Sequence, residues 1–242
     1  ARTQTAGPHA DPGVVARMGG LFLVAVDCTR PAPTCFCATS GHGPAAEDAF
    51  DIALTELVDP AADLAEYVAR AGSTRGRTVL DRLELDTASP SLIERAQAAV
   101  RRADDALLRE LPTDAADVVR NSGHPHWWVV AERCLACGNC TAVCPTCFCT
   151  DMEDRVDVHG STATRARVWD TCFSQEYSHL GAGPHRSSTM SRYRQWLTHK
   201  LGTWHDQFGE SGCVGCGRCV TWCPVGIDLT AEVESLSREV AV

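Results

Sequence analysis

The apolar positions in the N-terminal part of the chain are typical of a small layer of strands and helices. Residues 21–26 form an unbroken apolar run, which predicts a short and fully buried strand. Segments near 48–57 and 64–70 are candidate strands, and residues 74–85 have the pattern of a helix. We therefore expect a small α/β domain over residues 1–87.

A second region begins with a long helix. Ser89 is followed by Pro90, a pair that marks a helix start, and apolar residues recur at helical spacing to about Arg109. The rest of the chain has the pattern of short helices and loops. The sequence thus predicts a second domain over 88–242 and an α+β fold class.

Cysteine spacing is the strongest chemical signal in the second domain. Eight of the 14 cysteines fall in two runs of one pattern, each ending in Cys-Pro. The runs are Cys134-x2-Cys137-x2-Cys140-x3-Cys144-Pro145 and Cys213-x2-Cys216-x2-Cys219-x3-Cys223-Pro224. This spacing is typical of bacterial [4Fe–4S] sites, in which the fourth cysteine of one run usually ligates the other cluster.

The pattern predicts two four-cysteine ligand sets that exchange their last members. The first set is Cys134, Cys137, Cys140 and Cys223, and the second is Cys213, Cys216, Cys219 and Cys144. Backbone amides between the ligands are candidate donors to sulfur, at Ala136, Gly138, Gly215 and Gly217. We expect two [4Fe–4S] clusters.

Two other uses of these cysteines fit less well. Zinc sites usually show two cysteine pairs separated by a loop rather than four cysteines in one compact run. A disulfide scaffold is typical of small secreted domains that are richer in cysteine than this chain of 242 residues. Iron–sulfur binding is therefore the preferred interpretation.

The segment between the runs, 151–212, is long for a compact ferredoxin built from two tandem hairpins. We expect an α-helical ferredoxin-like domain in which this segment is an insertion. It is rich in Arg, His and aromatic residues, among them Arg165, Arg167, Trp169, Arg186, Arg192, Tyr193, Arg194, Trp196, His199 and Trp204, and it also contains Lys200. Two interpretations stay open: a helical insert with a solvated basic face, or a docking surface, since Arg and aromatic residues are enriched in interface cores.

The net charge and the hydropathy of the chain argue against nucleic acid and membranes as partners. The formal net charge is −9, and thiolate-bound clusters would make it more negative. Such a chain is a poor nucleic-acid binder, because phosphates require a basic surface. No apolar run reaches transmembrane length, so we expect no membrane span. Reduced thiols suggest the cytoplasm.

Six further cysteines lie outside the two runs. They are Cys28, Cys35, Cys37, Cys147, Cys149 and Cys172. The sequence Thr-Cys-Phe-Cys occurs twice among them, at 34–37 and 146–149. A single free cysteine is usually a small buried apolar residue, but three close together after a strand are harder to explain in that way.

We predict a third cluster or metal site on Cys28, Cys35 and Cys37. Its fourth ligand would be Cys172, Cys149 or a residue upstream of Ala1.

Motifs of a self-contained catalytic centre are missing from the sequence. There is no GxGxxG after a strand, no P-loop, no GxSxG and no HExxH. His124 and His126, beside Trp127 and Trp128, suit helix entry or packing better than metal ligation. We therefore expect a chain that transfers electrons and holds no catalytic residue.

Several segments together resemble one known family. They are Arg133–Cys149, Trp169–Cys172, Gly212–Asp228, Val26–Cys28 and Thr34–Cys37. These segments resemble the beta subunit of cytoplasmic NAD(P)-linked nickel–iron hydrogenases of the sulfhydrogenase type. They are also similar to the A subunit of anaerobic sulfite reductase. The resemblance covers nearly the whole chain.

The resemblance implies an iron–sulfur electron-transfer subunit with an α-helical ferredoxin-type domain. Its partners would be an FAD-containing diaphorase subunit that binds NAD(P) and the small and large hydrogenase subunits. Family members carry an additional N-terminal segment with a cysteine in Arg-Ala-Cys-Asp, so we expect the first domain to be incomplete here. Two alternatives stay open: the equivalent subunit of anaerobic sulfite reductase, and a stand-alone ferredoxin or structural metal-binding module.

Overall fold

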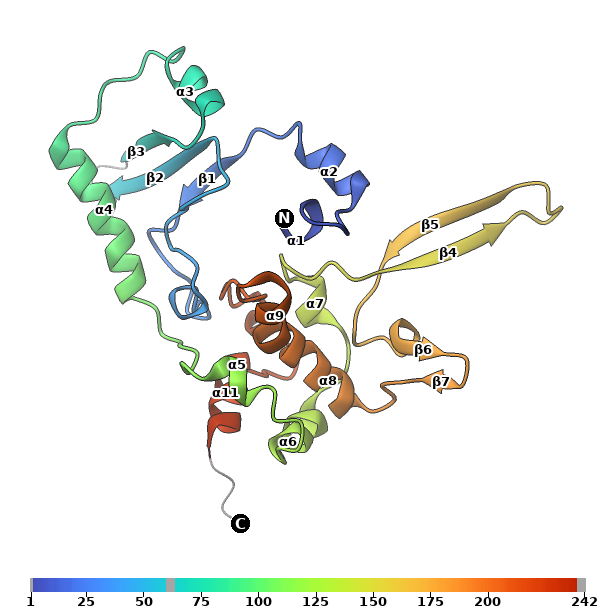
Figure 1. Cartoon of the computed structure of the whole chain (residues 1–242). Helices are drawn as coiled ribbons and strands as arrows, with labels where there is room; N and C mark the ends of the chain where they lie inside the picture. Colours follow the sequence, from blue (N-terminus) through green and yellow to red (C-terminus); the bar gives the residue numbers. More distant parts are fainter. Residues whose placement is uncertain (1, 60–63, 239–242) are drawn as a thin grey trace. The chain divides into compact units, whose positions relative to one another are not determined.

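The computed structural model describes residues 2–59 and 64–238 (Figure 1). Its helices and small sheets give the mixed architecture of the expected α+β class. The chain divides into two compact units, Ala1–Glu110 and Leu111–Val242. The boundary therefore falls after Glu110 rather than near residue 87, and the helix expected to open the second domain belongs to the first unit.

A three-stranded sheet in the order β1–β2–β3 lies at the centre of the first unit. Strand β1 (Val24–Asp27) runs parallel to β2 (Ile52–Asp59), and β2 pairs antiparallel with β3 (Leu64–Ala71). Strands β2 and β3 correspond to the two candidate strands that the sequence places near 48–57 and 64–70.

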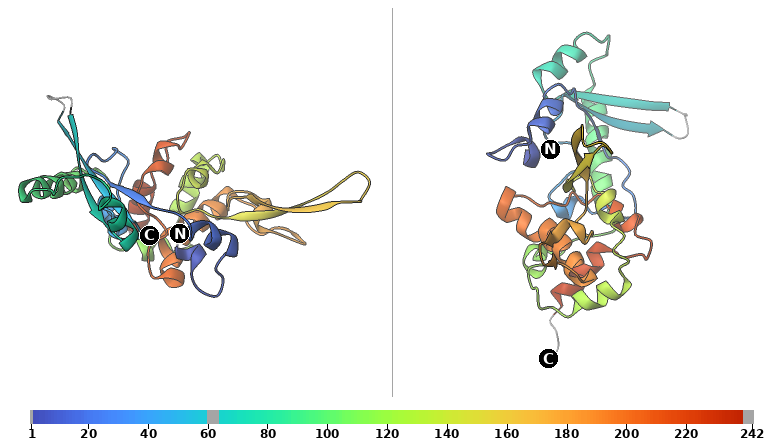
Figure 2. Two further views of the ribbon diagram at one scale, coloured as in Figure 1. Left: turned by 90° about the horizontal axis from the view of Figure 1, so that it is seen from above. Right: turned by 90° about the vertical axis from the view of Figure 1, so that its right-hand side faces the viewer.

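Helix α4 (Pro90–Asp105) packs against this sheet, and both views of Figure 2 show it beside β2 and β3. Ser89 caps the helix by accepting a hydrogen bond from a first-turn amide. Ala96 and Ala99 are buried against Leu57 of β2. The other helical segments of this unit are α1 (Arg2–Thr5), α2 (Pro12–Met18), η1 (Ala38–Ser40) and α3 (Thr74–Leu80).

The predicted burial of the first strand is wrong. The strand begins at Val24, and Val24 and Val26 are 51% and 65% exposed. Because β1 is an edge strand that pairs with β2 alone, its apolar run has no second neighbouring strand. The buried residue of β1 is Asp27, which accepts hydrogen bonds from the Ala46 amide and the Thr55 hydroxyl.

Short helices build the second unit. They are α5 (Ala115–Val118), α6 (His126–Arg133), α7 (Asn139–Ala142), α8 (Thr189–Leu197), η3 (Thr198–Thr203), α9 (Trp204–Phe208), α10 (Arg218–Thr221) and α11 (Leu229–Ser237). The segment η3 is a π-helical turn that joins α8 to α9. The core contains Trp127 and Val130 of α6, Leu197 of α8 and Val233 of α11.

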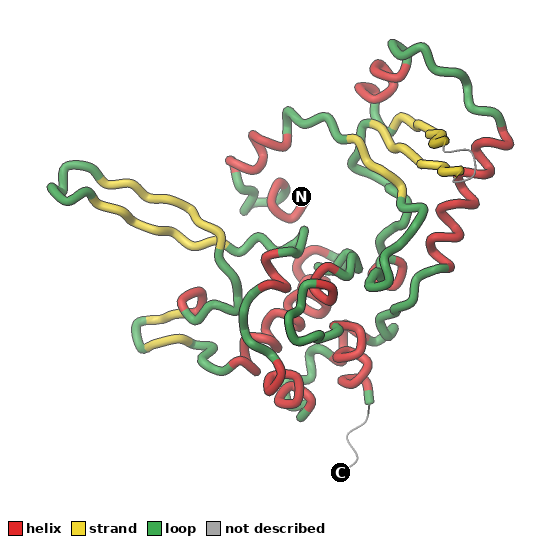
Figure 3. The backbone as a smooth tube through the Cα atoms, turned by 180° about the vertical axis from the view of Figure 1, so that it is seen from behind, coloured by secondary structure: helices red, strands yellow, loops and turns green. Residues whose placement is uncertain are grey.

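The insertion 151–212 is helical only in its second part. Its first part contains the hairpin β4–β5, the turn η2 and the strand pair β6–β7. Their bounds are β4 (Thr150–Val156), β5 (Ala163–Trp169), η2 (Glu176–Ser178), β6 (His179–Leu180) and β7 (Gly183–Pro184). Figures 1 and 3 show β4–β5 extending away from the helices of its own unit. The second part, α8 to α9, contacts α5 and α6 and supplies much of the core.

Candidate metal centres

The loop between α6 and α7 presents the first cysteine run. Cys134 follows α6, Cys137 lies in the loop and Cys140 lies on α7. Gly138 adopts a φ of 75°, in the left-handed region that glycine reaches at little cost. The Ala136 amide donates to the Cys134 sulfur at 3.4 Å, so the loop wraps around its first ligand as the spacing predicts.

The second run repeats this geometry. Gly217, with a φ of 65°, precedes α10, and the Gly215 amide donates to the Cys213 sulfur at 3.4 Å. Beyond the run, the Ile227 amide donates to the Cys223 sulfur at 3.2 Å. Each run therefore places backbone N–H groups against its own thiols, and such donors favour thiolate ligands.

The structure brings the first predicted ligand set around one cavity. Cys134, Cys137 and Cys140 line this cavity together with Cys223 from the other run. The cavity spans about 470 Å³, including space open to solvent, and its walls are largely apolar, with Leu135, Phe173, Val225, Ile227 and Leu229 among them. Among the described residues, no three His, Cys, Asp or Glu side chains converge as the donors of a single metal ion do. These cysteines instead surround a space.

The cysteines of the second predicted set lie close enough together for their charges to act on Cys219. Burial and the charges of Cys213, Cys144 and Cys216 together raise the pKa of the Cys219 thiol to about 12. These three are the partners that the exchanged ligand sets predict. Iron must displace the thiol protons, so cluster binding at this buried site is coupled to proton release.

The two sets lie next to each other. Burial raises the pKa of the Cys140 thiol. Among the neighbouring charges that also raise it, that of Cys219 in the second set has the largest effect. Cys219 also lines the cavity of the first set.

Three buried donors test whether a cluster fits the first cavity. In the part of the chain that the structure describes, the Tyr193 hydroxyl, the Trp196 indole N–H and the Arg192 Nε have no hydrogen-bond partner. Tyr193 and Trp196 also line the cavity. Buried donors are rarely left unsatisfied, and the sulfur atoms of a cluster would accept their hydrogen bonds. Burial and the nearby Glu232 carboxylate hold the pKa of Tyr193 well above its usual value, so its hydroxyl keeps its proton.

Lys200 supplies a positive charge at the second set. It lies in η3 and is only 4% exposed, and its ammonium donates to the Cys144 sulfur at 3.3 Å. It also donates to the Thr146 hydroxyl and the Gly212 carbonyl. Burial lowers the pKa of Lys200, but the thiolates of Cys144, Cys147 and Cys213 raise it by more, so the ammonium form persists.

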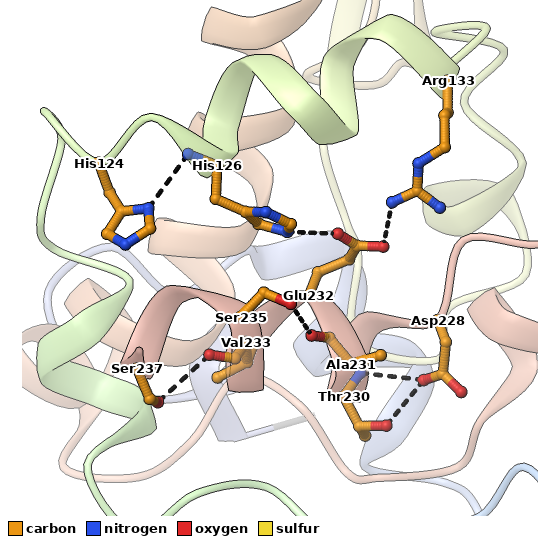
Figure 4. Close-up of polar contacts among 10 residues, drawn as sticks. All are labelled: His124, His126, Arg133, Asp228, Thr230, Ala231, Glu232, Val233, Ser235 and Ser237. Carbon is orange, nitrogen blue, oxygen red and sulfur yellow. Dashed lines mark hydrogen bonds and ion pairs between the residues drawn. The ribbon is translucent and has the colours of Figure 1, made fainter. Parts of the chain in front are cut away.

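An ion-pair network joins α6 to α11 next to the first cysteine run (Figure 4). The buried Glu232 carboxylate lies 2.5 Å from Arg133 and 2.6 Å from the His126 Nε2. The His124 Nδ1 accepts a hydrogen bond from the His126 amide at the start of α6. The two histidines thus make the helix-entry and packing contacts that the sequence predicts.

The six remaining cysteines form two groups. Cys28, Cys35 and Cys37 lie in the first unit, where burial raises the pKa of Cys37 and the thiolates of Cys35 and Cys28 raise it further. Cys172, predicted as a fourth ligand for this group, lies in the second unit. There it lines a cavity with Cys147 and Cys149.

The sequence interpretation missed the residues that surround the sulfurs. Tyr193, Trp196 and Lys200 were expected on a solvated or docking face, but they are buried. Their positions, with Leu197 and Leu201, follow the spacing of one helix face. That periodicity was the available signal for burial.

Comparisons with known proteins agree with these sites. A family model described as a 4Fe-4S dicluster domain matches residues 133–227. Sulfhydrogenase 2 subunit beta of Pyrococcus furiosus is 34% identical over 228 residues, which cover 90% of this chain. The chain spans 64% of the length of that relative. These two matches confirm the resemblance that the cysteine segments indicate.

No solved structure matches the chain. Within the described ranges, no helix has the length and apolar character needed to cross a membrane.

Proposed function

Because the chain contains a 4Fe-4S dicluster domain and is related to a sulfhydrogenase beta subunit, we propose that it is the iron–sulfur electron-transfer subunit of a hydrogenase complex. When bound, [4Fe–4S] clusters accept and release single electrons. The proposed partners are an FAD-containing diaphorase subunit that binds NAD(P) and the small and large subunits of a nickel–iron hydrogenase. The proposed compartment is the cytoplasm.

The observation that supports the proposal is that each run has a cysteine of the other run beside it. Cys223 lines the cavity of the first run, and Cys144 lies among the thiols of the second. We assign the first cluster to Cys134, Cys137, Cys140 and Cys223, and the second to Cys213, Cys216, Cys219 and Cys144. Adjacent sites of this kind suit electron transfer along a chain of clusters.

Other residues of the chain prepare the two sites. The apolar wall, which includes Phe173, keeps water away from the first site, and Tyr193 and Trp196 offer donors to sulfur. At the second site Lys200 compensates part of the negative charge of the thiolates. Hydrogen bonds, charge and burial are the means by which a protein sets a cluster potential.

The group of Cys28, Cys35 and Cys37 is kept as a proposed additional site in the first unit. The mutual effect of these thiols on the pKa of Cys37 supports it. Iron loss in a variant with all three changed to Ser would be its test.

Elemental analysis tests the proposed complex. The chain is tagged in its native host, the complex is isolated anaerobically, and its nickel and iron are measured. Nickel together with iron is expected. Iron without nickel would contradict the hydrogenase assignment and leave an electron-transfer subunit of another oxidoreductase, such as anaerobic sulfite reductase.

Two single variants test the cluster assignment. Cys137→Ser and Cys216→Ser should each lose or convert one cluster, and each variant serves as the control for the other. Electron paramagnetic resonance of the reduced proteins reports which signal is affected. Unchanged signals in both variants would refute the assignment.

A further inference from the structure

A second cysteine-lined cavity lies in the dicluster unit, apart from the ligand sets already assigned. Cys147, Cys149 and Cys172 line it, and it spans about 980 Å³, compared with about 470 Å³ for the cavity of the first set, both values including space open to solvent. All three thiols are half-buried. The cavity therefore has room for a group at least as large as a cubane.

The hairpin β4–β5 brings these cysteines together from distant parts of the sequence. Thr150, at the start of β4, pairs with Trp169, at the end of β5. The Asp170 amide then donates to the Cys149 carbonyl at 3.0 Å. Cys149 and Cys172 consequently flank the same end of the hairpin, and Cys147 precedes Cys149 by two residues.

The thiols are close enough to affect one another. Burial and the charge of the neighbouring Cys149 together raise the pKa of Cys172 to about 12. The Cys147 thiol donates a hydrogen bond to Cys144 of the second set, so the cavity borders that site. As with the cysteines of the first cavity, the three thiols do not converge on a single-ion site.

Basic side chains compensate the negative charge of such a group. The buried Lys200 lines the cavity, and Lys200 and Arg186 both favour the thiolate form of Cys172. The wall also holds His199 and Tyr177, an imidazole and a phenol that are non-cysteine donors for iron. Phe148 and Trp204 pack edge to face on the same wall.

We propose that Cys147, Cys149 and Cys172 bind a further iron–sulfur cluster beside the two of the dicluster domain. Three thiolates can hold a [3Fe–4S] cluster, or a [4Fe–4S] cluster whose fourth iron takes a non-cysteine ligand. Cys144, to which Cys147 is hydrogen-bonded, is kept in the second set because the cysteine spacing assigns it there and its charge acts on Cys219. The proposal does not depend on a hydrogenase as the partner.

The test compares iron and sulfide in two triple variants of the full chain. Wild type, C147S/C149S/C172S and the matched control C28S/C35S/C37S are reconstituted anaerobically with ferrous iron and sulfide. The first variant should contain about three or four fewer irons per chain than wild type, with matching sulfide, and should keep the signals of both cubanes. The control variant should keep the signal that the first variant has lost.

Several outcomes would overturn the proposal. Equal iron in wild type and C147S/C149S/C172S would do so, and so would wild type that holds zinc rather than iron at these thiols. If the triple variant loses all its iron through misfolding, the single variant Cys149→Ser provides the test of the proposal. A changed signal for one cluster beyond the two that Cys137→Ser and Cys216→Ser affect upholds the proposal, and its absence refutes it.

Discussion

Single side chains make the two assigned sites electrically different. The first site has neutral donors, the Tyr193 hydroxyl and the Trp196 indole, in its wall. The second has the full charge of Lys200 at 3.3 Å from a ligand sulfur. A buried cation stabilises the reduced, more negative form of a nearby cluster more strongly than a neutral dipole does, because the interior screens charge poorly. The second cluster should therefore have the higher potential of the two.

Replacing Lys200 by Met should lower the potential of the second cluster. The side chain keeps its length and loses its charge, so the shift is expected to be on the order of 60 mV, a tenfold change in the one-electron equilibrium. Redox titration monitored by electron paramagnetic resonance measures it, and Cys216→Ser identifies the signal.

Arg194→Met is the matched control for this charge. Arg194 belongs to the neighbouring helix α8 and donates to the Ser122 carbonyl. Its removal should leave both potentials nearly unchanged. An equal shift of the second-cluster potential in the two variants would mean that this potential depends on the net charge of the chain and not on the position of Lys200.

Tyr193→Phe should lower the potential of the first cluster by a smaller amount. The change removes one buried donor and no apolar volume. A shift of roughly 20–60 mV corresponds to a hydrogen bond of about 0.5–1.5 kcal/mol. Tyr67→Phe, which removes an exposed hydroxyl bonded to Glu56 in the first unit, is the control. A first-cluster potential equal to that of wild type would exclude the Tyr193 hydroxyl as a donor to sulfur.

At the residue scale the sequence indicates the ligands but not their surroundings. Cysteine spacing is a local property, and the two proposed ligand sets follow from it because a [4Fe–4S] cluster requires ligands at such spacing. Tyr193 and Lys200 reach the sulfur atoms only through the packing of α8 and η3. No local pattern specifies a contact between side chains more than fifty positions apart, such as that of Lys200 with Cys144.

At the scale of elements, a polar network centred on the buried Glu232 joins two helices of the second unit. Its carboxylate connects the C-terminal helix α11 to both ends of α6, through His126 and Arg133. Arg133 directly precedes the first ligand, so the network fixes the direction in which the chain enters the first site. The hydrogen bond to Glu232 also raises the pKa of Arg133.

Glu232→Gln should destabilise the iron-loaded protein by about 1–3 kcal/mol, because it replaces the buried carboxylate that accepts from His126 and Arg133 by a neutral amide. Anaerobic chemical unfolding measures the change. Glu234→Gln is the control on the same helix, since the Glu234 pair with Arg238 is exposed and should contribute little. Equal losses of stability in the two variants would contradict the role given to Glu232.

The insertion shows why burial of an element is harder to predict than its existence. Its Arg and aromatic residues divide between the exposed hairpin, with Arg165 and Trp169, and the buried helix, with Arg192 and Trp196. Both parts have similar composition. Composition therefore cannot separate a docking surface from a core, whereas the helical period of the second part can.

At the scale of the whole molecule, the fold class and the two candidate strands of the first unit followed from the sequence. The boundary between the units did not. Residues 90–105 form a helix with its own start signal, so the sequence separates them from the preceding strands. Tertiary packing instead places this helix in the same unit as the strands, since Ala96 and Ala99 are buried against Leu57 and Val68 of the sheet.

Two fragments test that boundary. A fragment of residues 111–242, reconstituted with ferrous iron and sulfide, should be a monomer that holds the iron of its two cubanes and of the further cluster proposed above, about eleven or twelve atoms per chain. A fragment of residues 88–242 should bind as much iron but associate, because it exposes the alanine face of α4. Light scattering after anaerobic size-exclusion chromatography distinguishes the two. If the 88–242 fragment is a monomer and the 111–242 fragment aggregates, α4 belongs to the dicluster unit and the boundary lies near residue 87. A monomeric pair would show that this alanine face is too small to drive association.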